Sequence, residues 1–210
     1  GYFRRDVMNM TYAWCLSAFK QQHSNDGRIA WYVILATMPA AFAGLLFGDM
    51  IEAHLRTTLV IAITTIVFGL VLGWADRSAI VKNKDITQLT VTIVCIIGIA
   101  QAIALIPGTS RSGITISAAL LCGLQREDAA RFSFLMSIPI IVLSGAYKGL
   151  QLVDVGSVNW SEMMLGAGVA AVSAYVCIHY FLKFINNMGM TVFVVYRLLL
   201  GGFLLYWSLA

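Results

Sequence analysis

Long uncharged apolar stretches alternate with short polar segments along the whole chain. Five of these stretches are close to the length that crosses a bilayer as a helix, which takes roughly 17–25 residues. They are 29–48, 57–75, 132–147, 163–182 and 191–210, the last of which contains Arg197. The pattern predicts an all-α integral membrane protein, built as a polytopic helical bundle.

One further apolar region is interrupted at its centre by the segment 107–113, which reads Pro-Gly-Thr-Ser-Arg-Ser-Gly. The residues on either side, 89–106 and 114–124, carry no charge. This region is either a tight spanning hairpin or a re-entrant helix–loop–helix. Irregular backbone persists at membrane depth only where it is buried in protein or lines a wet cavity. We therefore predict a re-entrant hairpin over about 91–124.

The distribution of Lys and Arg between alternate loops predicts the orientation of the chain. The loops of one side hold ten of these residues and those of the other side two, and the richer side is the cytoplasmic one. The richer set is Arg4, Arg5, Lys20, Arg28, Arg77, Lys82, Lys84, Arg126, Arg131 and Lys183, and the poorer set is Arg56 and Lys148. Both flanks of the interrupted region belong to the richer side, so we expect that region to enter and return on one face.

The composition agrees with a membrane protein and excludes other classes. Hydrophobic residues make up 60% of the chain and charged residues 11%, whereas a soluble domain carries about 25% charged residues. The net charge of +4 is spread over loops, so we predict no nucleic-acid binding. The four cysteines lack C-x-x-C spacing and the three histidines are isolated, so neither type predicts a metal site.

The start of the chain carries two signals. Residues 1–5 are typical of the last turn of a membrane helix at a basic interface, so we expect sequence upstream of Gly1. Residues 5–20 have apolar side chains at helical spacing, which predicts an amphipathic helix at the cytoplasmic surface.

A weak internal sequence repeat, termed the internal echo, suggests two related halves. A shift of 133 residues (58 to 191) aligns Thr58 with Thr191, Gly69 with Gly202, Leu72 with Leu205 and Trp74 with Trp207. Inverted repeats of this kind occur in many transport folds. We predict one transmembrane domain over 1–210, with 1–75 as the remainder of a first repeat and 87–210 as a second.

Arg111 lies at the tip of the predicted hairpin. An arginine at membrane depth costs several kcal/mol unless an anion meets it. All ten carboxylates lie in loops or at segment ends, so none is placed to neutralise it. The counter-ion is then a ligand, such as a phosphate on a lipid carrier, or it comes with metal-binding carboxylates upstream. The alternative is a capped helix break whose arginine reaches water.

The neighbours of Arg111 suit an anion. Glycines allow a tight turn and close approach, and a helix that we expect to start near Gly113 points free N–H groups at the loop. The guanidinium matches phosphate oxygens bidentately. Gln101 could orient water or brace the loop, and Arg197 either contributes to the site or snorkels to water. The remaining candidates are Gly108, Thr109, Ser110, Ser112, Gly113 and Thr115.

Four groups of residues resemble the bacterial undecaprenyl-diphosphate phosphatases, also known as bacitracin-resistance proteins. They are Gly98-Ile99-Ala100-Gln101, the segment from Ile106 to Thr115, Arg131-Phe132-Ser133-Phe134-Leu135 with Pro139, and the closing Val195-Tyr196-Arg197. The likeness runs through the whole chain in segment order. Its specific part is the Pro-Gly-x-Ser-Arg-Ser-Gly block.

The resemblance implies a multi-pass enzyme of the bacterial inner membrane. It implies hydrolysis of undecaprenyl diphosphate to the monophosphate, which recycles the carrier for cell-wall synthesis, at a site that opens to the periplasm. It implies a divalent cation, Mg²⁺ or Ca²⁺, and two inverted repeats with re-entrant helix pairs. Arg111 and Ser110 are then the catalytic residues, and Gly108, Thr109, Ser112, Gly113, Thr115, Gln101 and Arg197 bind the substrate.

One part of the family pattern is absent. The family's first motif has paired acidic residues followed by a Pro-x-Ser-Ser-type loop and a histidine, and nothing in these 210 residues matches it. The metal ligands and the nucleophile or base are therefore expected in an N-terminal segment before Gly1. The segment from Gly1 to Ala210 is not expected to be catalytic alone.

Two functions from other classes compete with the enzyme. A transporter, either a flippase of phosphorylated polyprenyl lipids or an anion carrier, would share inverted halves and mid-membrane hairpins. A structural subunit would hold membrane lipid in a groove without activity. The enzyme would release phosphate, whereas the transporter would move lipid between leaflets without releasing phosphate. The sequence leaves oligomerisation, the preferred polyprenyl substrate and the metal open.

Overall fold

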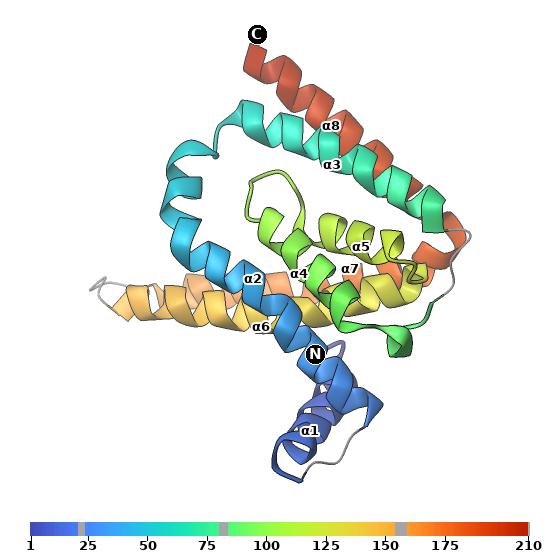
Figure 1. Ribbon diagram of the computed structural model, residues 1–210. Coiled ribbons are helices and arrows are strands. Elements are labelled where there is room, and N and C mark those ends of the chain that lie inside the picture. The colour runs from blue at the N-terminus through green and yellow to red at the C-terminus, as the bar shows by residue number, and fades with distance from the viewer. Residues whose placement is uncertain (21–23, 80–83, 154–158, 210) are drawn as a thin grey trace.

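Helices alone build the part of the chain that the structure describes. A computed structural model describes residues 1–20, 24–79, 84–153 and 159–209, and Figure 1 shows their course. The elements are α1 (Arg4–Lys20), α2 (Asn25–His54), α3 (Thr58–Ser78), the 3-10 helix η2 (Ile86–Gln88), α4 (Val91–Ile103), α5 (Arg111–Leu121), α6 (Arg126–Val153), α7 (Trp160–Met188) and α8 (Thr191–Leu209). No strand occurs within these ranges, so the all-α prediction is confirmed.

The five predicted membrane spans correspond to α2, α3, α6, α7 and α8, each long and apolar enough to cross a bilayer. With 21 residues, α3 is about 30 Å long, the thickness of the hydrocarbon core. α2 and α6 extend beyond their predicted spans to 30 and 28 residues, because polar residues continue both helices past the apolar stretch. Ala210, the last residue of the fifth predicted span, lies outside the described residues.

The amphipathic helix predicted over 5–20 is α1. Arg4 and Arg5 form its first turn together with Asp6, so the prediction that they close a preceding helix is wrong. An acidic residue in the first turn favours a helix start there, since it meets the positive end of the helix dipole. Asp6 also pairs with Arg131 of α6, which ties α1 to the bundle.

α4 and α5 form a hairpin inside an arch made by α2 and α3 (Figure 1). The two legs have 13 and 11 residues, hence lengths of about 20 and 16 Å, too short to cross a bilayer. The legs meet at their base, where the amide of Lys84 donates to the carbonyl of Gly123 at 3.0 Å and that of Gln125 to the carbonyl of Lys84 at 2.9 Å. These lengths favour a re-entrant hairpin over a spanning one, and its depth in a bilayer stays a prediction.

The hairpin is the centre of the apolar core. Val94 and Ile97 of α4, Leu120 of α5 and Phe132 of α6 are all fully buried. α4 also crosses α2 closely, because a Cβ at Gly98 would lie 2.9 Å from the carbonyl oxygen of Ala36. The tip of the hairpin is therefore held on a packed scaffold.

α3 and α8 pack antiparallel along their length (Figure 1). A Cβ on Gly201 would lie 2.5 Å from Cγ1 of Ile66, and one on Gly69 would lie 3.2 Å from Cβ of Arg197. Small residues allow two helices in a membrane to approach this closely. These are the two helices that the internal echo aligns, and the relation between two halves stays a prediction.

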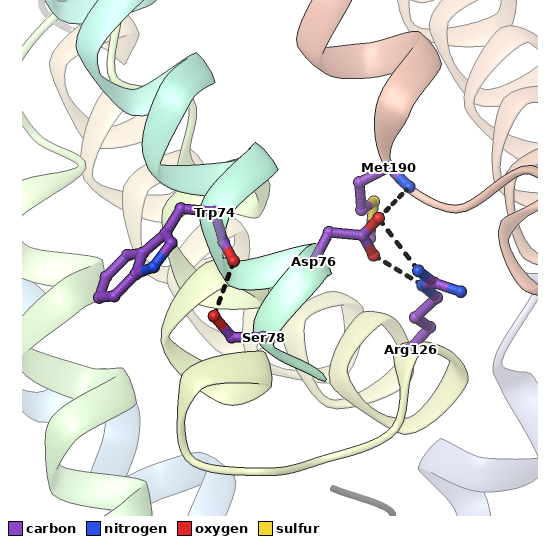
Figure 2. A network of polar contacts seen from close by, with 5 residues as sticks. All are labelled: Trp74, Asp76, Ser78, Arg126 and Met190. Atoms are coloured by element: carbon purple, nitrogen blue, oxygen red, sulfur yellow. Dashed lines mark hydrogen bonds and ion pairs between the residues drawn. The ribbon is translucent and has the colours of Figure 1, made fainter. Parts of the chain in front are cut away.

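A buried carboxylate joins α3, α6 and the turn before α8 (Figure 2). Asp76 accepts hydrogen bonds from Nε and Nη2 of Arg126, at 2.6 and 3.1 Å, and from the amide of Met190 at 3.1 Å. Gly189 adopts a φ of +59° and leaves room for the carboxylate of Asp76. A Cβ at Gly189 would lie only 3.0 Å from Oδ2 of Asp76. These contacts of Asp76 with Arg126 and Met190, termed the clamp, fix the position at which α8 starts along α3.

Replacing Asp76 with alanine is expected to destabilise the protein. The side chain of Asp76 is 7% exposed and that of Arg126 28%, so the change leaves a largely buried guanidinium unpaired, at a cost of about 2–3 kcal/mol. The thermal unfolding midpoint in detergent should fall by about 5–10 °C. Arg56→Ala is the matched control, because its pair with Glu52 is more than half exposed and contributes little. Equal midpoints for the two variants would contradict the clamp.

Candidate functional site

The loop that joins α4 to α5, residues 104–110 and termed the tip loop, carries the predicted chemistry. It contains two residues in the left-handed region, Gly108 with a φ of +88° and Ser110 with a φ of +66°. Within the described ranges Ser110 is the one residue other than glycine with a positive φ. Such a conformation costs on the order of 1–3 kcal/mol and persists where the surroundings enforce it, often at functional sites.

Gly108 lies directly against α3. A Cβ at this position would be 2.2 Å from Oγ1 of Thr64 and 2.5 Å from the carbonyl oxygen of Ile61. No side chain fits there without moving the loop away from α3. Gly108 was predicted to let a ligand approach the loop closely. It instead lets the loop approach the backbone of α3 closely.

We expect Gly108→Ala to lower the turnover of a reaction that depends on Arg111 about a hundredfold, because a catalytic group misplaced by about 1 Å loses that much. The added methyl group forces the tip loop off α3 and moves Arg111 with it. Initial rates on purified protein measure the effect. Gly202→Ala on α8 is the control, since a Cβ there meets nothing within 4 Å. Full activity in the Gly108 variant would show that the loop position is not critical.

Two threonines of α3 hold the tip loop, and sequence reasoning missed both. Oγ1 of Thr64 lies 2.6 Å from the carbonyl oxygen of Pro107, and 2.8 and 3.2 Å from those of Val60 and Ile61, so these acceptors share one hydroxyl proton. Thr65 donates from Oγ1 to the carbonyl of Gly108 at 3.2 Å. The available signal was a pair of adjacent hydroxyls in the middle of an otherwise apolar span.

Arg197 does not snorkel to water. It turns inward from α8 and is 9% exposed. Its Nε donates to the carbonyl of Thr65 at 3.3 Å, and its Nη2 donates to the carbonyls of Gly108 and Thr109 at 2.8 and 3.0 Å. Its Nη1 lies 3.7 Å from the place a Cβ on Gly113 would take, so it faces the first turn of α5. Arg197 therefore joins α3, α8 and the tip loop.

Arg111 is the first residue of α5 and is half-buried. Its Nη1 is buried and has no hydrogen-bond partner among the residues that the structure describes. It takes part in none of the three ion pairs found in the described part of the chain. A guanidinium removed from water without a counter-ion is costly, so this position suits an anionic ligand.

The start of α5 differs from the prediction near Gly113. The helix begins at Arg111 because Ser110 caps it, its Oγ accepting from the amide of Gly113 at 3.3 Å. The amide of Gly113 is thus already used. The amides of Arg111 and Ser112 belong to the first turn, where a helix provides no acceptor, so they are the ones left for an anion.

Three predicted site residues point away from the exposed side of the tip loop. The hydroxyl of Thr115 is buried against Ser133, with the two oxygens 2.7 Å apart. Gln101 is buried in α4, where its Nε2 donates to the carbonyl of Ala36 at 3.4 Å, so it braces α2. Thr109 is fully buried, and its Oγ1 has no partner. Contact of these side chains with substrate stays a prediction.

A cavity of about 660 Å³ opens beside the tip loop between α5, α6, α7 and α8. Ser110, Ser112, Gly113 and Arg197 form its polar part. Apolar and aromatic side chains such as Ile116, Phe134, Phe181 and Phe193 form most of the rest. The loop chemistry thus meets a largely apolar space.

The residues that the structure describes include no group of three or more His, Cys, Asp or Glu side chains placed to hold a metal ion. The predicted divalent cation therefore finds no ligand set in this part of the chain. The start of α5 instead offers a guanidinium, two free amides of its first turn and the neighbouring hydroxyls of Ser110 and Ser112. Together they suit the tetrahedral oxygens of a phosphate.

Comparisons with known proteins agree with this chemistry. The family model described as bacitracin resistance protein BacA matches residues 1–203. An undecaprenyl-diphosphatase of Saccharophagus degradans is 56% identical over 208 residues, which cover 98% of this chain and 78% of that protein. The undecaprenyl-diphosphatase of Teredinibacter turnerae is 57% identical over 201 residues, 95% and 76% of the two chains. That of Aliivibrio salmonicida is 54% identical over 207 residues, 98% and 77%.

Proposed function

The chain belongs to the bacitracin resistance protein family, and we propose that its tip loop is the place where it hydrolyses undecaprenyl diphosphate to undecaprenyl phosphate. The activity follows from relatives named undecaprenyl-diphosphatase that are more than half identical over nearly the whole chain. The observation that carries the assignment of the site is Arg111. Its guanidinium is half-buried, and its Nη1 has no partner within the described ranges.

The terminal phosphate would lie at the N-terminus of α5. Arg111 binds its oxygens in a bidentate manner, and the amides of Arg111 and Ser112 donate from the first turn. Ser112, which lines the adjacent cavity, would add its hydroxyl. Arg197 holds the loop in place through Nε and Nη2, so only its Nη1 is left for the predicted contact with substrate.

Hydrolysis breaks the bond between the terminal phosphorus and the bridging oxygen. A water molecule attacks that phosphorus, inorganic phosphate is released, and undecaprenyl phosphate leaves with the bridging oxygen. Negative charge spreads over the phosphoryl oxygens in the transition state. A fixed guanidinium and fixed amides stabilise that charge without having to reorganise, because the loop already holds them in place.

The membrane is expected to be the bacterial inner membrane, with the hairpin base on the cytoplasmic side. The Lys- and Arg-rich loops support this orientation. Thr65, which holds the tip loop, lies 11 residues along α3 from Asp76 (76 − 65 = 11), or about 16 Å. The tip loop would therefore lie near mid-membrane, and an opening toward the periplasm rests on the family resemblance.

Phosphate release in proteoliposomes tests the function. The protein expressed from its natural gene should release phosphate from undecaprenyl diphosphate and leave the monophosphate in the bilayer. A flippase would move labelled lipid between leaflets without releasing phosphate. That outcome would replace the enzyme assignment with the transporter alternative.

We also expect a chelator to abolish the activity. The divalent cation is implied by the resemblance, and its ligands are expected in a segment that precedes Gly1. Treatment of the natural gene product with excess EDTA should reduce phosphate release to background, and Mg²⁺ or Ca²⁺ should restore it. Unchanged activity after exhaustive chelation would show that phosphoryl transfer by this protein depends on its own cationic side chains.

A further inference from the structure

We propose that Ser133 of α6 is a positioning residue of the phosphate site, and that it acts through Thr115 on the first peptide group of α5. This inference rests on the proposed function, because it takes the terminal phosphate to lie against the amide of Ser112. Ser133 does not touch the substrate in this assignment. It acts on the backbone that does.

Two buried hydroxyls connect α6 to the start of α5. Thr115 and Ser133 are 1% and 4% exposed, and their hydroxyl oxygens lie 2.7 Å apart. Oγ1 of Thr115 also lies 2.9 Å from the carbonyl oxygen of Arg111 and 3.3 Å from that of Ser112. Threonine hydroxyls often bond a carbonyl one turn back in their own helix, but here a second helix adds a further hydroxyl.

The chemistry of these groups sets the direction of the hydrogen bonds. A backbone carbonyl only accepts, and a threonine hydroxyl carries one proton. The proton of Thr115 is therefore directed to the carbonyls of Arg111 and Ser112, and the proton between the two hydroxyls comes from Ser133. The result, termed the hydroxyl relay, is a series of donors that runs from Ser133 to Thr115 and on to the carbonyl of Arg111.

The hydroxyl relay ends on the peptide group that faces the proposed phosphate. The carbonyl of Arg111 and the amide of Ser112 belong to one peptide group, and an amide in the first turn has no acceptor within its own helix. Hydrogen bonds in series strengthen one another in a low-dielectric interior, by about 10–30% per bond. A donor on the carbonyl of Arg111 therefore makes the amide of Ser112 a stronger donor to an anion.

The same contacts orient the start of α5. Thr115 lies four residues after Arg111, hence on the same face of the helix. Its buried contact with Ser133 holds this face against α6, so the first turn keeps one orientation relative to the bundle.

Ser117 provides the matched control, because its hydroxyl acts on a peptide group that cannot serve a ligand. This residue is also buried in α5, and its Oγ donates to the carbonyl of Gly113 at 2.7 Å. The amide of that peptide group belongs to Ile114 and already donates to the carbonyl of Ser110 at 3.0 Å. Ser117→Ala should therefore leave phosphate release unchanged.

Kinetics of four variants test the hydroxyl relay. Ser133→Ala should lower kcat about tenfold with little change in KM, because a stronger amide matters most when charge builds up on the phosphoryl oxygens. Thr115→Val keeps the shape of the side chain but removes the hydroxyl, so it should lower kcat at least as much. Thr115→Ser keeps the hydroxyl and should keep most of kcat. The variant with both Ser133→Ala and Thr115→Val should be no slower than Thr115→Val alone, because both changes break one series of bonds.

A spectroscopic measurement detects the hydroxyl relay directly. The sequence contains two Arg-Ser pairs, Arg77-Ser78 and Arg111-Ser112. Labelling arginine with ¹³C at the carbonyl and serine with ¹⁵N therefore selects these two peptide groups. Ser133→Ala should shift the ¹⁵N resonance of Ser112 and leave that of Ser78 in place. Inorganic phosphate, added as a probe, should shift the Ser112 resonance, and the variant should need a higher phosphate concentration than the unchanged protein.

The outcomes separate this inference from the proposed function. If the unchanged protein releases no phosphate from undecaprenyl diphosphate, the proposed function fails, and the phosphate titration still decides whether the hydroxyl relay serves an anion. If the unchanged protein is active but Ser133→Ala keeps its kcat, Ser133 is not a positioning residue. A lower kcat and a lower thermal unfolding midpoint, together with an unmoved Ser112 resonance, would assign Ser133 to packing alone and overturn the inference.

Discussion

Replacing Arg111 with alanine is expected to lower phosphate release from undecaprenyl diphosphate about a thousandfold. The guanidinium is half-buried at the start of α5 and has no counter-ion among the described residues. Its charge is therefore available to the phosphoryl oxygens as they gain charge. Both kcat and kcat/KM should fall, because the interaction is strongest in the transition state.

Arg111→Lys should recover part of this loss. Lysine keeps the charge but not the planar pair of donors, so it cannot bind two phosphate oxygens in parallel. We expect its rate to lie between those of the alanine variant and the unchanged protein. Arg56 is an exposed arginine in the loops that carry few Lys and Arg residues. Its replacement by alanine should keep full activity. Near-normal phosphate release by Arg111→Ala would remove the proposed site altogether.

The membrane architecture was predictable because it depends on local composition. Apolar stretches such as 57–75 are long enough to span a bilayer, and each became a helix, with α2, α6 and α7 extended at both ends. The hairpin was predictable for a different reason. Cationic segments on both of its flanks require the chain to return to the same face, and the polar segment 107–113 places the turn.

The tip loop was predictable in its residues but not in its contacts. The need for glycine at 108 is visible in the sequence, whereas its neighbour on α3 is not, because Thr64 and Pro107 are 43 residues apart. The start of α5 was misplaced for a local reason. Ser110 adopts a left-handed backbone and caps the helix itself, so the helix begins two residues before Gly113.

Arg197, which is buried, and Arg111, which is half-buried, show why charge alone does not define a site. Both lie in apolar surroundings without a carboxylate partner among the described residues. Arg197 satisfies its Nε and Nη2 on three backbone carbonyls, which stabilise a buried cation without neutralising it. In the described part of the chain, Nη1 of Arg111 has no carbonyl or other acceptor. The first therefore supports the loop, and the second is left to bind an anion.

Arg197→Met is expected to lower kcat about a hundredfold by moving the loop that carries Arg111. Methionine keeps much of the apolar volume but removes the donors to the carbonyls of Gly108 and Thr109. The carbonyl of Gly108 keeps the hydrogen bond from Thr65, but that of Thr109 loses its donor. A buried carbonyl left without a partner costs about 1–3 kcal/mol, so the loop should shift until water reaches the Thr109 oxygen. Leu199→Met, on the exposed face of α8, is the control and should change neither kcat nor KM.

A double-mutant cycle distinguishes support of the loop from direct binding of substrate. If Arg197 acts through the position of Arg111, the variant with both Arg111→Ala and Arg197→Met should be little slower than Arg111→Ala alone, because the second change displaces a group that is already gone. If Arg197 binds the diphosphate independently, the two losses should multiply to about a hundred-thousandfold. Multiplied losses would return Arg197 to the substrate-binding residues and leave Thr64 and Thr65 as the supports of the loop.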